Sequence, residues 1–490
     1  MTGAFDAIVV GAGSAGCVLA ARLSEDPARH VCLLEAGPDH READLPEELR
    51  RLGRPVAWPY EWGEHVLSTQ GRALPYLRGR GVGGSSGVNG GVALRVERED
   101  LAAWPAGWRF DELLPELRRL ERDLDFGDAP WHGRDGPIPI VRWPLEAHAP
   151  YQRAFHEACL AQGLPACADH NAPDTTGVGP IPMNRIGDRR VSCALAYLEP
   201  ARARANLEVR GDALVRRALL EAGRATGVEL ASGERLGAGE VWLCAGVVQS
   251  PGILWRSGVG PAGPLRRLGI PVAVELPDVG SHWSDHLVVT FAAPVEPGAA
   301  PRGAPGLQSI LRATAPGSAR RNDLQLTPWV RRGEDGRREL AISASLQLPV
   351  GSGSVALASA EANARPRLHW PFAGIAENAR RLREGWRLAA RIALASGVLA
   401  DAAPARRVLD ASDAELDARV AREHGAFYHG VGTCRMAEAG SREGVVDPSC
   451  RVRGVAALRV ADASIAPAVP RTNTNLLAIA IAERAASLAG

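Results

Sequence analysis

Lysine is missing from this 490-residue chain, whose 57 basic residues are all arginine. The absence excludes a catalytic lysine and a Schiff base formed on one. The abundance of arginine, alanine and glycine is typical of a GC-rich genome. The formal net charge is only +1, so nothing in the charge favours nucleic acid or an anionic membrane as a partner.

Long apolar runs and cysteine pairs are also missing. No uninterrupted apolar run reaches the roughly 20 residues that span a bilayer, so we expect no integral membrane segment. The opening MTGAFDAIVVGAG has neither a basic region nor a cleavage site, so we expect no secretory signal. The eight cysteines are scattered without a C-x-x-C pair. This spacing favours neither a zinc site nor a disulfide framework and predicts a cytoplasmic protein.

The composition is that of a globular protein, with 46% hydrophobic and 23% charged residues. A chain of this length exceeds one ordinary core, which predicts two large lobes. The Pro/Gly/Ala-rich segment 294–306 predicts a surface loop. The arginine-rich segment 378–392 has helical periodicity and predicts an amphipathic helix with one solvated face.

The amino-terminal segment has the pattern of a dinucleotide-binding βαβ unit. An apolar run precedes Gly11-x-Gly13-x-x-Gly16, a helix is predicted from about Ser14, and a second buried strand ends at Glu35. Gly11 allows the tight turn, Gly13 lets the backbone approach a pyrophosphate, and Gly16 lets helix and strand pack closely. The helix N-terminus favours the phosphates, and Glu35 can accept hydrogen bonds from ribose hydroxyls. The motif alone does not separate NAD from FAD.

Glycine-rich segments continue along the whole chain. Residues 77–96 form a second one that ends in a β-type run, 206–230 predict a strand and a hairpin, 240–260 predict strand, turn and helix, and 458–490 predict strand, turn and closing helix. A nicotinamide-dependent enzyme would need only the first motif. Segments spread so widely favour a large, elongated cofactor held by distant parts of the chain.

Four of these blocks, in this order, make the chain resemble the glucose–methanol–choline (GMC) oxidoreductase family. They are the amino-terminal motif, GRGVGGSSGVNGG at 79–91, AGVVQSPGILWRSGVG at 245–260, and the stretch from YHGVGTCRM to NTN at 428–475. LPDVGSHWSDHL at 276–287 also resembles a family segment. The resemblance runs from about residue 6 to 488.

The resemblance implies FAD and the oxidation of an alcohol carbon by hydride transfer to flavin N5. It implies an α/β, Rossmann-like FAD-binding domain and an α+β substrate domain with an antiparallel sheet. By this resemblance the first domain comprises residues 1–140, 195–282 and 426–490, and the second comprises 141–194 and 283–425.

The resemblance also assigns residues to the cofactor. Val88 stands where some members carry a histidine that bonds FAD covalently, so we expect non-covalent FAD. The assigned cofactor-binding residues are Gly11, Gly13, Ser14, Ala15, Gly16, Glu35, Ala36, Gly84, Ser85, Asn89, Gly90, Gly91, Val92, Val215, Ala245, Asp462, Ala463, Thr474 and Asn475.

His429 and Asn473 are the candidate catalytic residues. Oxidising an alcohol removes a hydroxyl proton, and a neutral imidazole suits a proton acceptor at working pH. His429 falls in the block where the family has its active-site histidine. Asn473 occupies the second position of the family's pair, and an amide can orient a hydroxyl but cannot act as a base. Asn473 is also a candidate helix cap, since a helix is predicted from about 473–474 with its positive end toward the flavin.

Other candidates are weaker. His282, Asp285 and His286 resemble a metal cluster, but the family carries this block without a metal, so we expect none. Tyr428 and Trp370 are candidates for lining the substrate cavity, although an aromatic residue at such a position is as often part of the core.

The sequence leaves the substrate and the electron acceptor open. We expect a small-molecule alcohol as substrate and oxygen or a redox carrier as acceptor. Segments 121–140 and 87–95 are similar to the actinobacterial, mycofactocin-associated subgroup of GMC dehydrogenases, in which the acceptor would be a carrier. A lyase with a non-redox FAD is an alternative from a different class.

Overall fold

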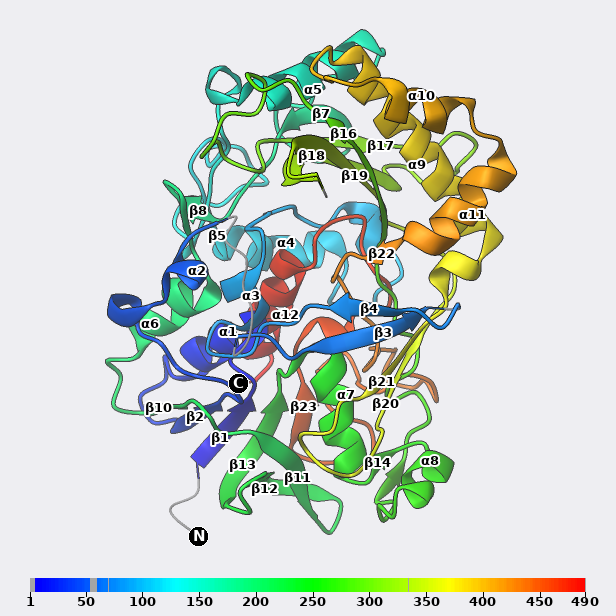
Figure 1. Cartoon of the computed structure of the whole chain (residues 1–490). Helices are drawn as coiled ribbons and strands as arrows, with labels where there is room; N and C mark the ends of the chain where they lie inside the picture. The colour runs from blue at the N-terminus through cyan, green and yellow to red at the C-terminus, as the bar shows by residue number, and fades with distance from the viewer. Residues whose placement is uncertain (1–4, 53–59, 69, 334, 490) are drawn as a thin grey trace.

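The computed structural model describes residues 5–52, 60–68, 70–333 and 335–489. Its two largest sheets lie one above the other, with helix α12 (Asn475–Ser487) between them (Figure 1). The lower sheet in this view contains the amino-terminal strand, and the upper sheet is built from the middle of the chain. Both parts of the predicted fold class are present.

The lower sheet has seven strands in the order β10-β2-β1-β13-β12-β11, with β23 also paired to β13. Strands β10, β2, β1, β13 and β23 run parallel, and β11 to β13 form an antiparallel meander. The short, buried apolar runs of β1 and β2 are typical of parallel strands covered on both faces. The strands are β1 (Phe5–Val10), β2 (Val31–Leu34), β10 (Leu207–Arg210), β11 (Val215–Glu221), β12 (Arg224–Leu230), β13 (Arg235–Leu243) and β23 (Leu458–Val460).

Helix α1 (Ser14–Leu23) begins where the sequence predicts and packs against α12. Helix α7 (Gly246–Arg256) follows β13 after a short turn, also as predicted. The hairpin of β11 and β12 turns at residues 221–224, with Ala222 and Gly223 in the left-handed region. These local predictions are therefore confirmed.

The upper sheet is antiparallel, in the order β22-β16-β19-β18-β17-β7. Helix α9 (Ala376–Ala395) packs on β16, β18 and β19, and it is flanked by α5 (Pro150–Ala161), α10 (Ala403–Asp410) and α11 (Asp413–Glu423), which also contact strands of the sheet (Figure 1). The strands are β7 (Gly177–Pro180), β16 (Leu287–Pro294), β17 (Ser309–Ala313), β18 (Leu324–Arg332), β19 (Arg338–Leu346) and β22 (Gly425–Ala426).

A third sheet, in the order β20-β21-β3-β4, joins distant segments. Its strands are β3 (Glu64–Ser68), β4 (Ala73–Tyr76), β20 (Ser354–Ala356) and β21 (Arg367–Trp370). The first two fall in the segments predicted to bind FAD and the last two in those predicted to bind substrate. The proposed domain division therefore cuts through a hydrogen-bonded sheet, and it stays a prediction.

Shorter elements complete the fold. Single helical turns lie at Glu42–Asp44, Arg98–Leu101, Leu145–Ala147, Ala194–Leu198, Phe372–Gly374 and Ala463–Ile465. The remaining elements are α2 (Glu47–Arg50), α3 (Gly84–Val88), α4 (Phe110–Arg119), α6 (Glu199–Ala201), α8 (Ala262–Arg267), β5 (Glu121–Asp123), β6 (Ile138–Ile140), β8 (Arg185–Ile186), β9 (Arg189–Arg190), β14 (Val259–Gly260) and β15 (Val274–Glu275).

Two local predictions need correction. The run after the second glycine-rich block forms no strand of a sheet. Instead, the Asn171 side chain accepts from the N–H of Arg95 and donates to the carbonyl of Ala93. The helix over 378–392 is present, but Arg381 and Arg383 are buried in it, and Arg381 lies 3.2 Å from Asp323. Buried carboxylate partners let arginine occupy the inner face of a helix.

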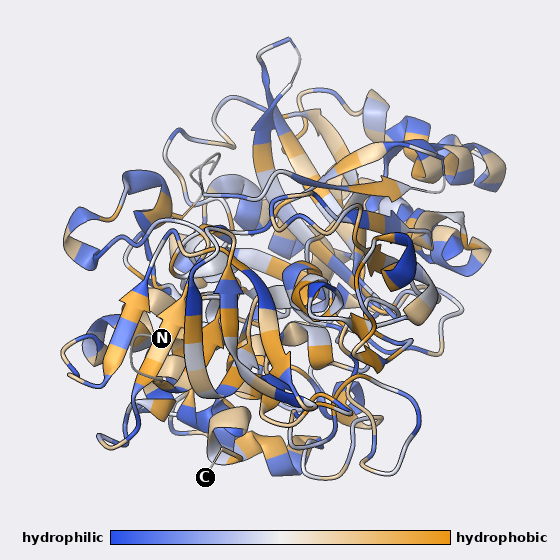
Figure 2. Ribbon diagram, turned by 90° about the horizontal axis from the view of Figure 1, so that it is seen from below, coloured by the Kyte–Doolittle hydropathy of each residue, from blue (hydrophilic) through white to orange (hydrophobic). Residues whose placement is uncertain are grey.

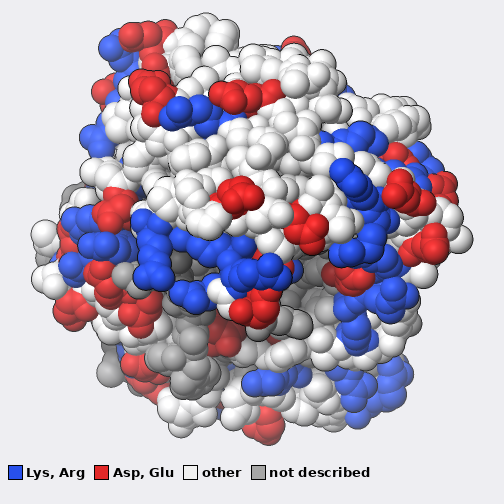
Figure 3. Space-filling model, turned by 45° about the horizontal axis from the view of Figure 1, so that its top comes forward, with Lys and Arg blue, Asp and Glu red and all other residues white. Residues whose placement is uncertain are grey.

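The distribution of polar residues follows the layers. The strands are largely hydrophobic and the peripheral helices alternate hydrophobic and hydrophilic residues (Figure 2). Arginine and acidic side chains are interspersed over the face in Figure 3, with arginines grouped along a hollow. In the described part of the chain, no helix is long and apolar enough to cross a membrane.

Candidate active site

A cavity of about 700 Å³ lies at the carboxyl ends of the parallel strands. Gly11 and Glu35 directly follow β1 and β2, while Ala245 and Asp462 come two residues after β13 and β23, and all four line the cavity. Ligands of doubly wound sheets bind at this edge. The volume falls within the range of about 300–1,000 Å³ that is usual for ligand cavities.

The structure brings nearly all the predicted cofactor residues to this one cavity; Gly16 and Gly91 do not line it. A Cβ at Gly16 would lie 1.8 Å from the carbonyl oxygen of Gly11, so this glycine serves the packing of α1 on the turn. Gly91 has a φ of +72°, and a Cβ there would lie 2.8 Å from the Leu52 side chain.

The first glycine turn forms a cradle for an anionic group. Gly11 has a φ of +97°, which favours glycine. A Cβ at Gly13 would meet no atom within 4 Å, and Gly13 lines the cavity, so its backbone stands open to a ligand. Helix α1 begins at Ser14 and offers unpaired N–H groups there. The Ser14 hydroxyl donates to Asn475 Oδ1 at 2.7 Å and so links α1 to the start of α12.

Glu35 is fixed at the end of β2 by backbone donors. Its carboxylate accepts from the N–H groups of Ala12, Gly37 and Gly81 at 2.9, 2.9 and 3.0 Å. Burial raises the pKa of Glu35, and the three N–H groups oppose that rise. The carboxylate is thus held in the position where the ribose of a dinucleotide needs an acceptor.

Asp462 ties two cavity walls together. Its Oδ2 accepts from the N–H of Gly246 at 2.8 Å and from the Ser250 hydroxyl at 2.6 Å, both in α7. Its Oδ1 accepts from the N–H of Ser464 at 2.8 Å. The glycine cradle, the acceptor at Glu35 and this junction fit an elongated dinucleotide such as FAD. Val88, which also lines the cavity, has no nucleophilic atom for a covalent link.

His429 lies in a chain of hydrogen bonds that fixes its tautomer. His286 Nε2 is 2.7 Å from the carbonyl oxygen of Pro470, which can only accept, so His286 carries a proton on Nε2. Burial lowers the pKa of His286 to about 4, and its Nδ1 is therefore bare. His429 Nδ1, at 2.9 Å, must donate to it.

The other ring nitrogen of His429 is therefore a bare acceptor. Burial, the neighbouring His286 and the cation of Arg78 lower the pKa of His429 well below 6.5, so the ring is neutral. Its Nε2 faces Asn473 Nδ2 at 3.0 Å, and the amide donates to it. The Asn473 Oδ1 atom is buried without a hydrogen-bond partner among the described residues. Both side chains line the cavity.

Hydrogen bonds to Asp285 also fix the backbone of His286 and His429. Asp285 Oδ1 accepts from the N–H groups of His286 and His429, each at 2.7 Å. Tyr428 has a φ of +65°, a conformation that non-glycine residues rarely adopt and that clusters at functional sites. The Phe427 ring packs edge-on against His429 with centroids 5.0 Å apart.

Some assignments change at this site. The N-cap of α12 is Thr474, whose side chain makes no capping hydrogen bond. Asn473 is therefore not the cap; its side chain is hydrogen-bonded to His429. Tyr428 lines the cavity. Trp370 does not; it is buried beside His424 in the core.

Sequence reasoning missed His286 and the wall formed by the upper sheet. His286 was visible only as one member of a cluster that resembled a metal site. The wall consists of side chains from β18 and β19 that no short motif marks, and they are Gln325, Thr327, Trp329 and Ser343.

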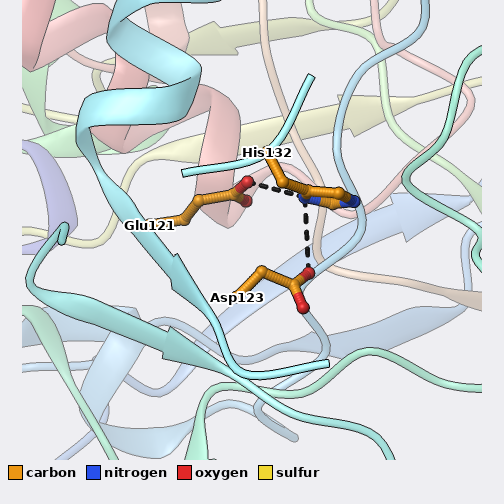
Figure 4. A group of neighbouring side chains, drawn as sticks. All are labelled: Glu121, Asp123 and His132. Carbon is orange, nitrogen blue, oxygen red and sulfur yellow. Dashed lines mark hydrogen bonds and ion pairs between the residues drawn. The ribbon is translucent and has the colours of Figure 1, made fainter. Parts of the chain in front are cut away.

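A separate group of buried titratable residues lies away from this cavity (Figure 4). His132 Nδ1 is 2.7 Å from Glu121 Oε1 and 3.3 Å from Asp123 Oδ2. Its Nε2 is 2.9 Å from Asp169 Oδ2. Burial opposes the charged ring, but the hydrogen bonds to Asp169 and Glu121 outweigh it and raise the pKa of His132.

Two arginines complete this group. Arg95 pairs with Glu121, and Arg142 pairs with Asp123 at 3.0 Å and with Asp169 at 2.7 Å. A fourth carboxylate, Asp125, lies 3.2 Å from Arg142. Four carboxylates thus face two guanidinium groups and the His132 ring, whose raised pKa favours the charged form. The geometry is that of a buried ion-pair network, and the expectation that the chain needs no metal stays a prediction.

The doubly wound sheet, the glycine cradle and the buried histidine–asparagine pair define a dinucleotide-dependent oxidoreductase. The chain belongs to the GMC oxidoreductase family, whose models match residues 5–288 and 349–482. Members of this family are FAD flavoproteins, and this chain is an FAD-dependent oxidoreductase. The expected family resemblance and cofactor are therefore confirmed.

Three relatives illustrate the similarity. An uncharacterised GMC-type oxidoreductase of Rhodococcus erythropolis is 36% identical, covering 99% of this chain and 98% of the relative. A 5-(hydroxymethyl)furfural oxidase of Methylovorus sp. is 34% identical and covers 98% of each chain. The crystal structure of pyridoxine 4-oxidase from Mesorbium loti is 31% identical, with a TM-score of 0.86 and coverage of 99% of this chain and 98% of that chain.

Proposed function

We propose that the protein oxidises a small-molecule alcohol to a carbonyl compound, with His429 as the base that accepts the hydroxyl proton. The bare Nε2 of His429, held toward the cavity by the contact with His286, carries this proposal. When bound, FAD accepts the hydride of the alcohol carbon at flavin N5. The predicted cofactor residues along the cavity hold its ADP half, its linker and its ring.

The protein's part in the reaction is to bind the hydroxyl and take its proton. An alcohol entering the cavity takes the place of Asn473 as hydrogen donor to His429 Nε2. The amide of Asn473 then donates to the alcohol oxygen and orients it. When the proton moves to Nε2, the ring becomes a cation whose Nδ1–H still donates to His286. The base therefore keeps its orientation through the reaction.

Helix α12 supports the same chemistry. Its first residue, Asn475, and its N-cap, Thr474, line the cavity. The positive end of a helix favours negative charge on a ligand placed there. This polarity would stabilise the reduced, anionic cofactor and so favour hydride acceptance.

Two of the relatives are named for an alcohol carried on a ring, and we take these as support for a ring alcohol; others are named choline dehydrogenases. One is named a 5-(hydroxymethyl)furfural oxidase and another a pyridoxine 4-oxidase. The electron acceptor in our proposal is oxygen or a redox carrier, the latter if the chain belongs to the mycofactocin-associated subgroup. All eight cysteines are buried and unpaired, which suits a reducing cytoplasm.

The test is anaerobic addition of primary alcohols to the purified flavoprotein, followed by the absorbance of oxidised flavin. We expect one class of alcohol to bleach the flavin and to yield the matching carbonyl compound. Admitting air would then distinguish an oxidase, which regains its colour rapidly, from a dehydrogenase that needs a carrier. A flavin that stays oxidised while a cyanohydrin is cleaved would contradict the proposal and favour the lyase alternative.

A further inference from the structure

The cavity has one wall made of the upper sheet, and that wall is polar although it is buried. On β18 the side chains of Gln325, Thr327 and Trp329 line the cavity. Strand residues two apart share a face, and the alternate positions Leu324 and Leu326 lie in the core. A buried sheet face that presents amide and hydroxyl groups needs partners for them, because unpaired polar groups are costly.

Those partners are missing among the residues that the structure describes. Gln325 is only 3% exposed, and its Oε1 has no hydrogen-bond partner among the described residues. Its side-chain nitrogen and the Thr327 hydroxyl make no hydrogen bond in that part of the chain either. By contrast, Trp329 Nε1 donates to Ser343 Oγ at 2.9 Å, so this indole is fixed. The side chains of Gln325 and Thr327 can therefore form hydrogen bonds with a ligand in the cavity.

The order of the strands places this pair two strands away from the segment that carries His286. His286 directly precedes β16, and β16 pairs with β22 just before His429. In the sheet, β18 lies two strands away from β16, with β19 between them. Two strand spacings amount to about 10 Å between the backbones of β16 and β18, a span on the scale of a substituted ring that lies over the sheet. Leu287 and Leu324 both pair with Leu346, so they lie in one row across the sheet, and Gln325 directly follows Leu324.

We propose that Gln325 and Thr327 bind a second, neutral polar group of the substrate, at the end remote from the carbon that is oxidised. The inference rests on the proposed function and adds the substrate class: a ring alcohol with a hydroxyl or carbonyl group across the ring. The amide of Gln325 can both donate and accept, and the hydroxyl of Thr327 can do the same. Because Gln325, Thr327, Trp329 and Ser343 are all neutral, a charged group placed here would be buried unpaired.

Matched alcohols and variants test this assignment. The probes are 1,4-benzenedimethanol and 4-methylbenzyl alcohol, which differ in the remote hydroxyl, together with 4-(hydroxymethyl)benzoate as the charged counterpart. The variants are Gln325→Leu, which keeps the approximate volume but removes the amide, and Thr327→Val. Gln325→Glu replaces the amide by a carboxyl group of the same shape. FAD content and the unfolding midpoint of each variant report whether it is folded.

Flavin reduction under anaerobic conditions gives the first readout. We expect the wild type to favour the diol over the methyl analogue in kcat/KM by roughly tenfold to hundredfold, since the analogue leaves the wall unpaired. Gln325→Leu should lose most of this preference, because it removes the amide that pairs with the remote hydroxyl. Thr327→Val should lose part of it, and the benzoate should be the poorest substrate of the wild type. An equal preference in wild type and both variants would overturn the proposal.

Equilibrium binding gives a readout that needs no turnover. 4-(Hydroxymethyl)benzaldehyde and 4-methylbenzaldehyde are titrated against the holoprotein and followed by the change in the flavin spectrum. If no alcohol bleaches the flavin but the hydroxylated aldehyde binds more tightly in a Gln325-dependent manner, the oxidation fails and the polar subsite stands. If alcohols are oxidised but neither assay depends on Gln325 or Thr327, the oxidation stands and the subsite is refuted.

Discussion

At the scale of single residues, the site depends on which nitrogen of His429 carries the proton. Imidazole has two nitrogens, and a base is useful only if the bare one faces the substrate. The carbonyl of Pro470 fixes the proton of His286, and His286 in turn fixes that of His429. In our proposal, His286 is therefore a positioning residue that acts on the alcohol through its neighbour.

Replacing His286 tests this positioning role. His286→Ala removes the acceptor for His429 Nδ1 and allows the ring to adopt the other tautomer. We expect flavin reduction by alcohol to slow roughly tenfold to hundredfold, part of the usual contribution of a general base. His286→Gln, which can offer a carbonyl oxygen in the same region, should recover part of the rate. The control is His282→Asn in the same segment, which keeps a residue that tolerates the φ of +57° found there.

The rates of these variants are compared at equal FAD content by rapid anaerobic mixing. A His286→Ala protein that reduces its flavin as fast as the wild type would show that the relay has no role. Equal losses in His286→Ala and His286→Gln would show that the effect is one of packing.

The pH dependence of kcat/KM reports the state of His429. In our proposal His429 acts as a base when it is neutral, and burial lowers its pKa well below 6.5. Activity should therefore be lost only as the pH falls below 6.5, and it should not rise further between neutral and mildly alkaline pH. An acid limb whose midpoint lies above 6.5 would show that His429 is not the titrating base, provided the flavin stays bound across the range.

At the scale of elements, strand ends and glycine turns build the cavity, and this determines what the sequence could predict. The dinucleotide turn was predictable because Gly11, Gly13 and Gly16 act through local sterics. The polar residues on β18 could not be predicted as cavity residues. The alternation of Gln325 and Thr327 with core leucines shows that they share a face of the strand, but not that this face borders the cavity. The tautomer relay likewise joins segments more than a hundred residues apart.

Substitutions of Gly13 and Gly16, two glycines of the same turn, should have different effects on FAD binding and on stability. A valine side chain at Gly13 would project into the cavity, where a Cβ meets nothing within 4 Å. Gly13→Val should fold and lose FAD. Gly16→Ala places a Cβ against the Gly11 carbonyl, so it should lower the unfolding midpoint as well.

The control is Gly87→Ala in α3, where a Cβ also meets nothing within 4 Å and which does not line the cavity. It should retain FAD and be as stable as the wild type, or slightly more stable. Flavin absorbance and thermal unfolding measure all three variants. A Gly13→Val protein with a full complement of FAD would contradict the assignment of the cradle.

At the scale of the whole molecule, distant segments are joined by buried polar networks. The ion-pair network around His132 connects Arg95, just beyond the second glycine block, with Asp169 on the other side of the proposed domain boundary. Breaking such a buried network by removing one partner typically costs about 3–5 kcal/mol. No short motif marks it, because the segment that carries Glu121, Asp123 and His132 is joined by Arg95, Arg142 and Asp169 from other parts of the chain.

His132→Asn should lower the free energy of unfolding in a pH-dependent way. Because the folded protein raises the pKa of His132, its stabilising effect is fully present below pH 6.5 and is lost as the pH rises through the folded pKa. The deficit of the variant should therefore be largest at about pH 6 and smaller at about pH 9. Denaturant unfolding of both proteins at equal FAD concentration measures it, and other titrating groups cancel in the comparison. A deficit that grows with pH would mean that His132 is neutral in the folded protein.

Above all, we propose that His429 takes the proton when an alcohol is oxidised. The most direct measurement is the single-turnover rate of flavin reduction in wild type and His429→Ala, mixed anaerobically with the same saturating alcohol. We expect the variant to bind FAD normally and to reduce it about 100-fold more slowly or worse, the usual loss for a general base. A variant that reduces its flavin at the wild-type rate would contradict this proposal.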